Sequence, residues 1–110
     1  MKIQNVPFSL TDWKEMVPAE YKGETGTSYW RIFESGNIRV RMVEYSPGFY
    51  SDHWCSRGHV LLVLKGELSI KLRDGRDLKL SSGMSFQVGD DNANPHFAFT
   101  DKGAEVFIVD

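Results

Sequence analysis

The stretch "ELSIKLRDGRDLKLSSG", residues 67–83, constrains the fold of this 110-residue chain more than any other part of it. Two apolar runs of period two flank a turn, and their apolar members are Leu68, Ile70, Leu72, Leu78 and Leu80. Such alternation is typical of a β-strand with one buried face. Between the runs stands Asp74-Gly75, which favours a tight hairpin because both turn positions need a positive φ. The stretch therefore predicts two antiparallel strands joined by a short turn.

Most of the chain after residue 28 shows the same kind of signal. The segment "IRVRMVEY" at 38–45 alternates between two faces, and "VLLVL" at 60–64 is apolar at every position, which is typical of a strand buried on both sides. Further short strand-like runs occur at 28–34, 84–88, 96–100 and 104–109, and a polar loop at 89–95. About eight short strands with regular turns predict an all-β sandwich or barrel.

The N-terminal part is less regular. Asp12 and Glu15 have the spacing of a capping box, so we expect a short helix around residues 13–16, which Pro18 would stop. The segment "YKGETGTS" at 21–28 is interpreted as a loop. We therefore predict one domain over 1–110, with an irregular N-terminal extension over 1–28 and a barrel over 29–110.

Composition and charge exclude several classes of partner. With 41% hydrophobic and 25% charged residues, the chain is an ordinary globular sequence. A net charge of −2 offers no clustered positive field, so we expect no nucleic-acid partner. The longest apolar run, 60–64, is too short to cross a bilayer, and the N-terminus lacks the apolar segment of a signal peptide. We therefore expect a cytoplasmic protein, in which the lone Cys55 is a free thiol or a metal ligand.

The chemistry-bearing residues gather in "SDHWCSRGHVLLVLKGE", residues 51–67, which holds two of the three histidines and the only cysteine. In an extended segment, residues two apart point to the same side, so His53 and Cys55 are expected to project together. Imidazole and thiolate suit zinc, iron, nickel or copper better than magnesium or calcium. His59 opens the apolar strand and His96 opens a later one, and spacing alone leaves open whether the barrel brings them together.

These residues resemble a known family. Gly48, His53-x-Cys55, His59 and Gly66 are similar in spacing to the first motif of the cupin superfamily, in which two histidines and a glutamate lie between two glycines. Residues 83–100, with His96, match the second cupin motif loosely. "DHWC", "GHV", the leading "PF…TDW" and the closing "FIVD" further resemble the small single-domain DHCW-motif cupins.

The resemblance implies a cupin double-stranded β-helix, a small jelly-roll barrel with a metal near its mouth. It also implies that His53, Cys55, His59 and His96 occupy the four ligand positions. Cys55 then stands in place of the second histidine and His59 in place of the glutamate. One divalent transition metal per chain is expected, and zinc, iron, nickel and manganese remain open.

The role of Cys55 separates two kinds of site. If its thiolate is a ligand together with three histidines, the shell closes as a tetrahedron, which favours zinc and a structural or binding role. If it is not, the three histidines leave positions open for water, oxygen or substrate, which favours iron, nickel or manganese and Lewis-acid or oxygen chemistry. A third alternative is a degenerate cupin in which the histidines only pack.

Candidate pocket residues follow from the strand pattern. Arg39 and Arg41 lie on the face opposite Ile38, Val40 and Met42. The interpretation we favour for that face is a solvated one; if it lines the barrel instead, an arginine would clamp a substrate carboxylate. The remaining pocket candidates are aromatic and have core packing as their alternative role: Tyr45, Tyr50 and Trp54.

The first hypothesis for function is a metal-binding single-domain cupin that acts on a small molecule in the barrel pocket. Its alternatives are a non-catalytic module that holds or senses a small ligand or metal, and a cupin without metal. Whether the chain is an enzyme stays open at this stage. A homodimer is expected, because the apolar strand and the many aromatic residues suggest more buried surface than one small barrel offers.

Overall fold

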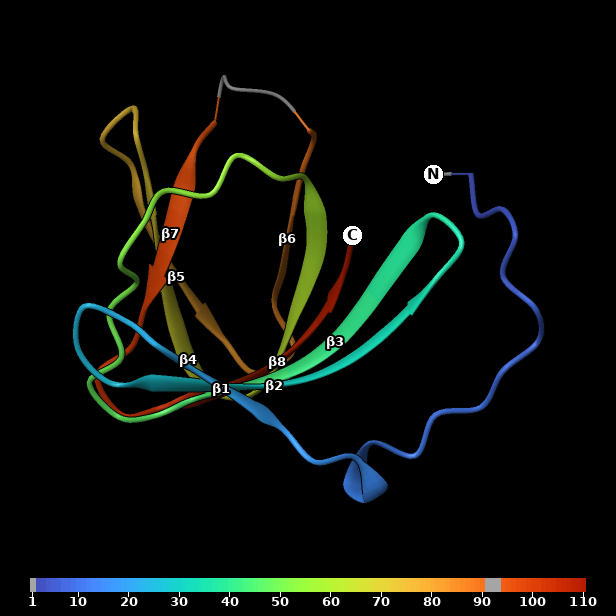
Figure 1. Ribbon diagram of the computed structural model, residues 1–110. Coiled ribbons are helices and arrows are strands. Elements are labelled where there is room, and N and C mark those ends of the chain that lie inside the picture. Colours follow the sequence, from blue (N-terminus) through green and yellow to red (C-terminus); the bar gives the residue numbers. More distant parts are fainter. Residues whose placement is uncertain (1, 91–93) are drawn as a thin grey trace.

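Eight strands and one turn of 3-10 helix build the computed structural model, which describes residues 2–90 and 94–110 (Figure 1). The elements are η1 (Trp13–Glu15), β1 (Ala19–Lys22), β2 (Thr27–Ser35), β3 (Ile38–Tyr45), β4 (His59–Leu72), β5 (Asp77–Ser81), β6 (Ser85–Val88), β7 (His96–Phe99) and β8 (Ala104–Val109). The all-β prediction is thus confirmed. No helix among the described residues is long and apolar enough to cross a membrane.

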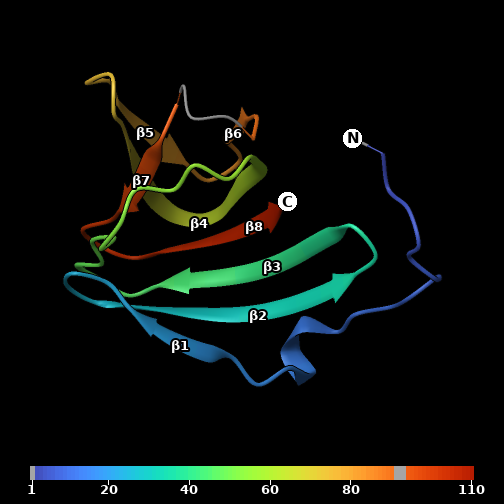
Figure 2. The ribbon, with the colours of Figure 1, turned by 45° about the horizontal axis from the view of Figure 1, so that its top comes forward.

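Strand β4 joins the two halves of the barrel. The antiparallel strand order is β1-β2-β3-β8-β4-β5, and β6 and β7 also pair with β4. The first half of β4 pairs with β8 and β6, and its second half pairs with β5 and β7. Figures 1 and 2 show β4 curving from one sheet into the other, so that the sheets enclose a common interior in the manner of a jelly roll.

A glycine permits the bend of β4. Gly66 has a φ of +76°, and a Cβ placed there would collide with the carbonyl oxygen of Gly103. The ladder between β4 and β8 also shifts register between Val63 and Lys65. Glycine adopts this left-handed conformation without the steric cost that a side chain would bring. The bend therefore depends on Gly66, which the sequence resemblance had matched to the second glycine of the motif.

The core lies where β3, β8 and β4 meet. Inward-facing residues alternate along these strands as period two requires, and the fully buried ones include Val43, Val63, Leu68 and Val106. The outer face of β4 differs from prediction, because Val60 is 41% exposed and Leu62 and Leu64 are only half-buried. The expectation that residues 60–64 are buried on both faces is therefore wrong for the outer face.

The N-terminal part contains more strand than expected. Residues 19–22 form β1 and pair with β2, which begins at Thr27, so the interpretation of 21–28 as a loop is wrong at both ends. All four residues of β1 are exposed, which explains why no apolar alternation marks it. The expected helical turn is present as η1, where the side chain of Asp12 accepts a hydrogen bond from the Lys14 amide. Of the polar loop at 89–95, residues 91–93 lie outside the described residues.

Candidate metal centre

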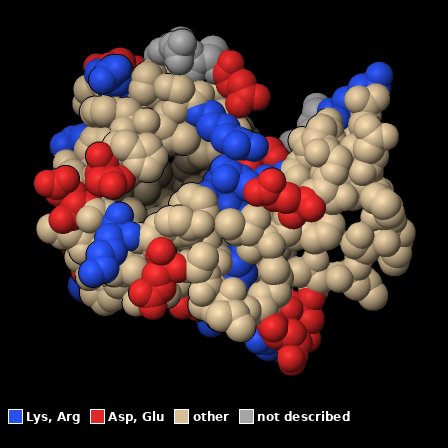
Figure 3. Space-filling view, viewed as in Figure 1, with Lys and Arg blue, Asp and Glu red and all other residues tan. Residues whose placement is uncertain are grey.

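A cavity of about 130 Å³ lies inside the barrel. Its wall is mostly apolar and includes Trp30, Phe49, Leu61, Ile70, Phe86, Phe97 and Ile108, and its polar lining includes Arg41, Tyr45, Cys55, His59 and His96. Figure 3 shows this end of the molecule hollowed toward the middle of the barrel. A concave, largely apolar space with a few converging polar groups is the usual form of a small-molecule site.

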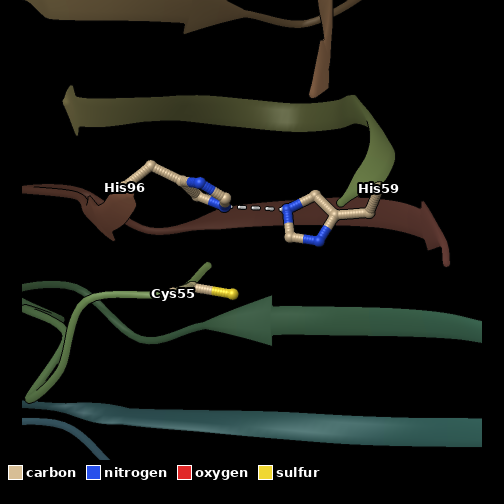
Figure 4. Close-up of side chains that lie close together, drawn as sticks. All are labelled: Cys55, His59 and His96. Carbon is tan, nitrogen blue, oxygen red and sulfur yellow. Dashed lines mark hydrogen bonds between the residues drawn. The ribbon is translucent and has the colours of Figure 1, made fainter. Parts of the chain in front are cut away.

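Three candidate ligands converge in this cavity. Cys55, His59 and His96 each offer a donor atom, and these atoms all lie within 4.8 Å of one another. The Nε2 atoms of the two histidines are 3.0 Å apart, and the thiol of Cys55 points toward them (Figure 4). The His59 side chain is 7% exposed and His96 is 4% exposed, whereas Cys55 is half-buried. The group, which we call the Cys-His-His cluster, thus faces the cavity rather than solvent.

The backbone places two members of the cluster side by side. The amide of Cys55 donates to the His96 carbonyl at 2.7 Å, and the amide of His96 donates back to the Cys55 carbonyl at 3.0 Å. This reciprocal pair is an isolated antiparallel bridge at the start of β7. Residues 41 positions apart in the chain are therefore neighbours by backbone pairing, before any side-chain contact is considered.

His59 is held from the other side of the barrel. It is the first residue of β4 and pairs with Val88 of β6. The amide of the preceding Gly58 donates to Oδ1 of Asp90 at 2.6 Å, and a Cβ on Gly58 would collide with the backbone at Gly89. This close approach of two segments directs the His59 side chain into the cavity.

Each histidine has its second ring nitrogen directed at an oxygen. His96 Nδ1 lies 3.3 Å from the Asn94 carbonyl, to which it donates in the tautomer that leaves Nε2 free. His59 Nδ1 is buried without a hydrogen-bond partner among the described residues, and Oδ2 of Asp110 lies 3.5 Å from it. A carboxylate behind the distal nitrogen of a histidine is a common support for a metal-binding imidazole.

Asp110 is the functional candidate that the sequence analysis missed. Its side chain is 1% exposed. Arg39 donates hydrogen bonds to both of its carboxylate oxygens, at 2.9 and 3.0 Å, and Arg41 donates one to Oδ2 at 3.0 Å. Burial alone would raise the pKa of Asp110, but the hydrogen bond from Arg39 and the neighbouring arginine charges outweigh it and lower that pKa. Period two could have found the residue, because the inward positions 104, 106 and 108 of β8 extend to 110.

The prediction that the Arg39 and Arg41 face of β3 is exposed to solvent is wrong. Arg41 is only 5% exposed, and its guanidinium lies over the ring of Trp30, with 4.5 Å from its central carbon to the ring centroid. Arg39 is 19% exposed in its side chain. These arginines are tolerated inside because Asp110, at the end of the neighbouring strand β8, supplies a buried negative charge. Arg41 therefore lines the cavity, as the alternative interpretation required.

His53 lies apart from the cluster. The chain bends at Asp52 and His53, so the rule that residues two apart share a face does not apply here. The His53 side chain is 72% exposed, and its Nδ1 lies 2.7 Å from Oδ1 of Asp52, which was expected to point away from it. His53 still contributes to the lining of the cavity, so its place is at the rim. Its role as a fourth ligand remains a prediction.

Of the three aromatic residues predicted to line the pocket, one does so and two do not. Tyr45 lines the cavity, whereas Tyr50 and Trp54 do not belong to its lining. Both of these pack instead on Phe97, at 5.1 and 4.6 Å between ring centroids. They act behind the cavity wall, where Phe97 is the residue that contacts the interior.

The electrostatics of the cluster favour donor atoms without protons at His59 and Cys55. Burial and the nearby charge of His96 lower the pKa of His59 to about 4. A hydrogen bond with His96 holds the pKa of the Cys55 thiol below its usual value. Burial would lower the pKa of His96, but its hydrogen bonds with Cys55 and the Asn94 carbonyl raise it. A neutral His59 and an acidified Cys55 are the forms that bind metals.

The donor set fits a divalent transition metal. Two nitrogens that each lie about 2.0–2.1 Å from one tetrahedral ion are about 3.3 Å apart. The observed 3.0 Å between the Nε2 atoms of His59 and His96 is close to that spacing. Two imidazoles and a thiolate suit zinc, iron and nickel, whereas manganese prefers oxygen ligands. The cluster therefore has the chemistry of a metal site.

Comparisons with known proteins place this geometry in a wider context. No model of a known protein family matches the sequence, and no curated protein matches it. Solved structures do match. A predicted oxalate decarboxylase from Thermotoga maritima is 15% identical, with a TM-score of 0.76 over 92% of this chain and 96% of that chain.

Two further structures are similar. An RmlC-like cupin from Shewanella frigidimarina is 15% identical, with a TM-score of 0.72 over 96% of this chain and 92% of that one. Fe(II)-HppE, solved with an alternative substrate, is 15% identical, with a TM-score of 0.74 over 94% of this chain and 60% of that one. At such identities the likeness establishes the fold, so the expected cupin jelly roll is confirmed. The narrower likeness to DHCW-motif cupins remains a resemblance.

Proposed function

We propose that this chain, which has the cupin fold, binds one divalent transition metal through the Cys-His-His cluster and acts on a small molecule in the adjoining cavity. The observation that carries the proposal is the convergence of three donor atoms within 4.8 Å on the wall of a largely apolar cavity. Similarity to Fe(II)-HppE supports iron as one candidate, and the thiolate supports zinc as another.

The surrounding residues have distinct parts in this proposal. Asp110 lies behind Nδ1 of His59, and the Asn94 carbonyl lies behind Nδ1 of His96, so each oxygen favours the tautomer that leaves Nε2 free for a metal. Cys55 supplies a negative sulfur. A metal held in this way supplies Lewis acidity or, in the case of iron, oxygen chemistry. The largely apolar wall surrounds the space beside the ligands.

The number of ligands distinguishes an enzyme from a binding module. Three protein ligands leave a coordination position for water or substrate, which is the pattern of catalytic sites. His53 at the rim is the residue that would close the shell as a fourth ligand. A closed shell supports the second candidate function, a non-catalytic module that holds the metal itself.

A chelator competition tests the proposal. We expect Cys55→Ser to lower the affinity for zinc and iron(II) at least tenfold, because a ligand is lost. His53→Ala is the matched variant: unchanged affinity supports the open three-ligand site, and an equal loss supports the closed one. Wild-type affinity in Cys55→Ser would remove the sulfur from the metal's coordination.

A further inference from the structure

Arg41 is a buried cation that the protein does not fully satisfy. The residue is 5% exposed, and its Nε atom is buried without a hydrogen-bond partner among the described residues. Among the described residues, its ionic contact runs from Nη2 to Oδ2 of Asp110 at 3.0 Å. A buried polar group without a partner is costly, and Arg41 is also one of the residues that line the cavity, so an acceptor supplied from the cavity would be favourable.

The charges around Arg41 do not balance. Asp110 carries one negative charge, and Arg39 already binds both of its oxygens. Arg57 also approaches Oδ2, at 3.5 Å. One carboxylate therefore serves three guanidinium groups, and Arg41 is the most deeply buried of them. An excess positive charge with so little access to water favours an anionic ligand.

The other anionic groups of the cavity are already paired. Asp52 lies at the rim, where His53 contacts it at 2.7 Å. The Cys55 sulfur belongs to the Cys-His-His cluster. Tyr45 is neutral near pH 7 and adds no negative charge. Arg41 is thus the cation left to receive an acid from the cavity side.

We propose that the cavity takes a small monocarboxylic acid, whose carboxylate pairs with Arg41 and whose short apolar body lies against the cavity wall. The planar guanidinium matches a carboxylate through its N–H donors, of which Nη2 already donates to Asp110. Trp30, over which the guanidinium lies, holds that plane in place. The small volume of about 130 Å³ limits the body to a few carbons.

The inference deepens the proposed function and rests on it for any chemistry at the metal. Arg41 and the Cys-His-His cluster line one cavity, so an acid bound to Arg41 lies in the same space as the candidate ligands. The carboxylate contact itself depends on Arg41 and not on the metal. The two proposals can therefore fail separately.

The test is an NMR titration of the intact protein, both as purified and after chelator treatment, which follows the arginine Nε–H signals. The probes are propanoate and its neutral isostere propanamide. We expect propanoate to shift the Arg41 signal and to bind at least tenfold more tightly than propanamide. Equal binding of the two probes, or no binding of propanoate, would overturn the inference without involving any variant.

Two variants sharpen the assignment. Arg41→Lys keeps the charge but removes the fork and the Nε donor, and we expect at least a tenfold loss of propanoate affinity. Arg76→Lys, at an exposed ion pair with Asp74, should bind propanoate as the wild type does. Wild-type affinity in Arg41→Lys contradicts the inference. Should that variant not fold, the contrast between propanoate and propanamide decides alone.

Further outcomes distinguish a failure of the acid site from a failure of the proposed metal site. Metal uptake without propanoate binding overturns the acid site alone. Propanoate binding in a protein that takes up no metal overturns the proposed function and leaves the acid site standing. Tighter binding of inorganic phosphate than of propanoate would replace the organic acid with a simple oxyanion and so overturn the assignment.

Discussion

Asp110 is the side chain placed to support His59 as a metal ligand. The carboxylate lies 3.5 Å behind Nδ1 and is itself held by Arg39 and Arg41. We predict that Asp110→Asn lowers metal affinity about tenfold to a hundredfold, because outer partners of ligating histidines usually contribute that much. Chelator competition measures it, with the exposed Asp101→Asn as control. An unchanged affinity in a folded Asp110→Asn protein would mean that His59 does not need this support.

Tyr45 is expected to make the free energy of unfolding depend on pH, and a single variant can isolate its contribution. Its pKa is raised by burial to about 12 from the usual 10. Between these values the unfolded chain loses the proton first, so the native state binds more protons and stability falls as pH rises. The loss is at most roughly 3 kcal/mol at the upper end. Urea unfolding at pH 8 and pH 11 should show a smaller loss in Tyr45→Phe; parallel losses would contradict the burial of the neutral phenol.

Sequence reasoning reached some of these residues and not others, for physical reasons. The cupin resemblance singled out Cys55, His59 and His96 by spacing, although the bend at Asp52 leaves His53 apart from them. Asp110 could have been predicted to face inward, because the buried positions 104, 106 and 108 continue to 110 at a period of two. The burial of Arg41 could not have been predicted from local patterns, because the carboxylate that neutralises it lies 69 positions away in the sequence.

At the scale of elements, the bend of β4 is the feature on which the barrel depends. Gly66 and Gly75 both have positive φ, but only Gly66 also has a neighbour, Gly103, in the space of a Cβ. We predict that Gly66→Ala destabilises the protein by more than about 1 kcal/mol beyond Gly75→Ala, because the second variant has the φ strain alone. Chemical denaturation measures the difference. Equal losses would show that the close approach to Gly103 does not matter.

The β4–β5 hairpin shows what local signals can predict. The two strands pair as expected, and Ile70 faces Leu78 across the ladder. The turn differs from the predicted one, because Gly75 has a positive φ and Asp74 does not. The Gly75 amide donates to the Leu72 carbonyl, so Arg73 and Asp74 are the central residues of the turn. Strand β1 shows their limit, since its exposed residues carry no periodic signal and it forms only because β2 offers an edge. Patterns of burial predict strands that have a buried face and miss those that do not.

For the whole molecule, we propose a homodimer. The N-terminal segment runs apart from the barrel in Figures 1 and 2, with Phe8 and Leu10 93% and 89% exposed. Val60, on the outer face of β4, is also exposed. Apolar side chains in such positions are normally covered, and a second copy presents the same surfaces in return. Light scattering after size exclusion should give a dimer, and Phe8→Ser with Leu10→Ser should shift it to monomer. A wild-type monomer at micromolar concentration would contradict this proposal.

The central claim is that the barrel encloses a metal site, and elemental analysis of protein purified without a histidine tag tests it most directly. The account predicts close to one transition-metal ion per chain, zinc or iron, and its loss when His59 and His96 are both replaced by alanine. Protein that contains no metal, and that takes up neither zinc nor iron(II) on reconstitution, would contradict the account and leave the Cys-His-His cluster as polar packing inside a cupin barrel.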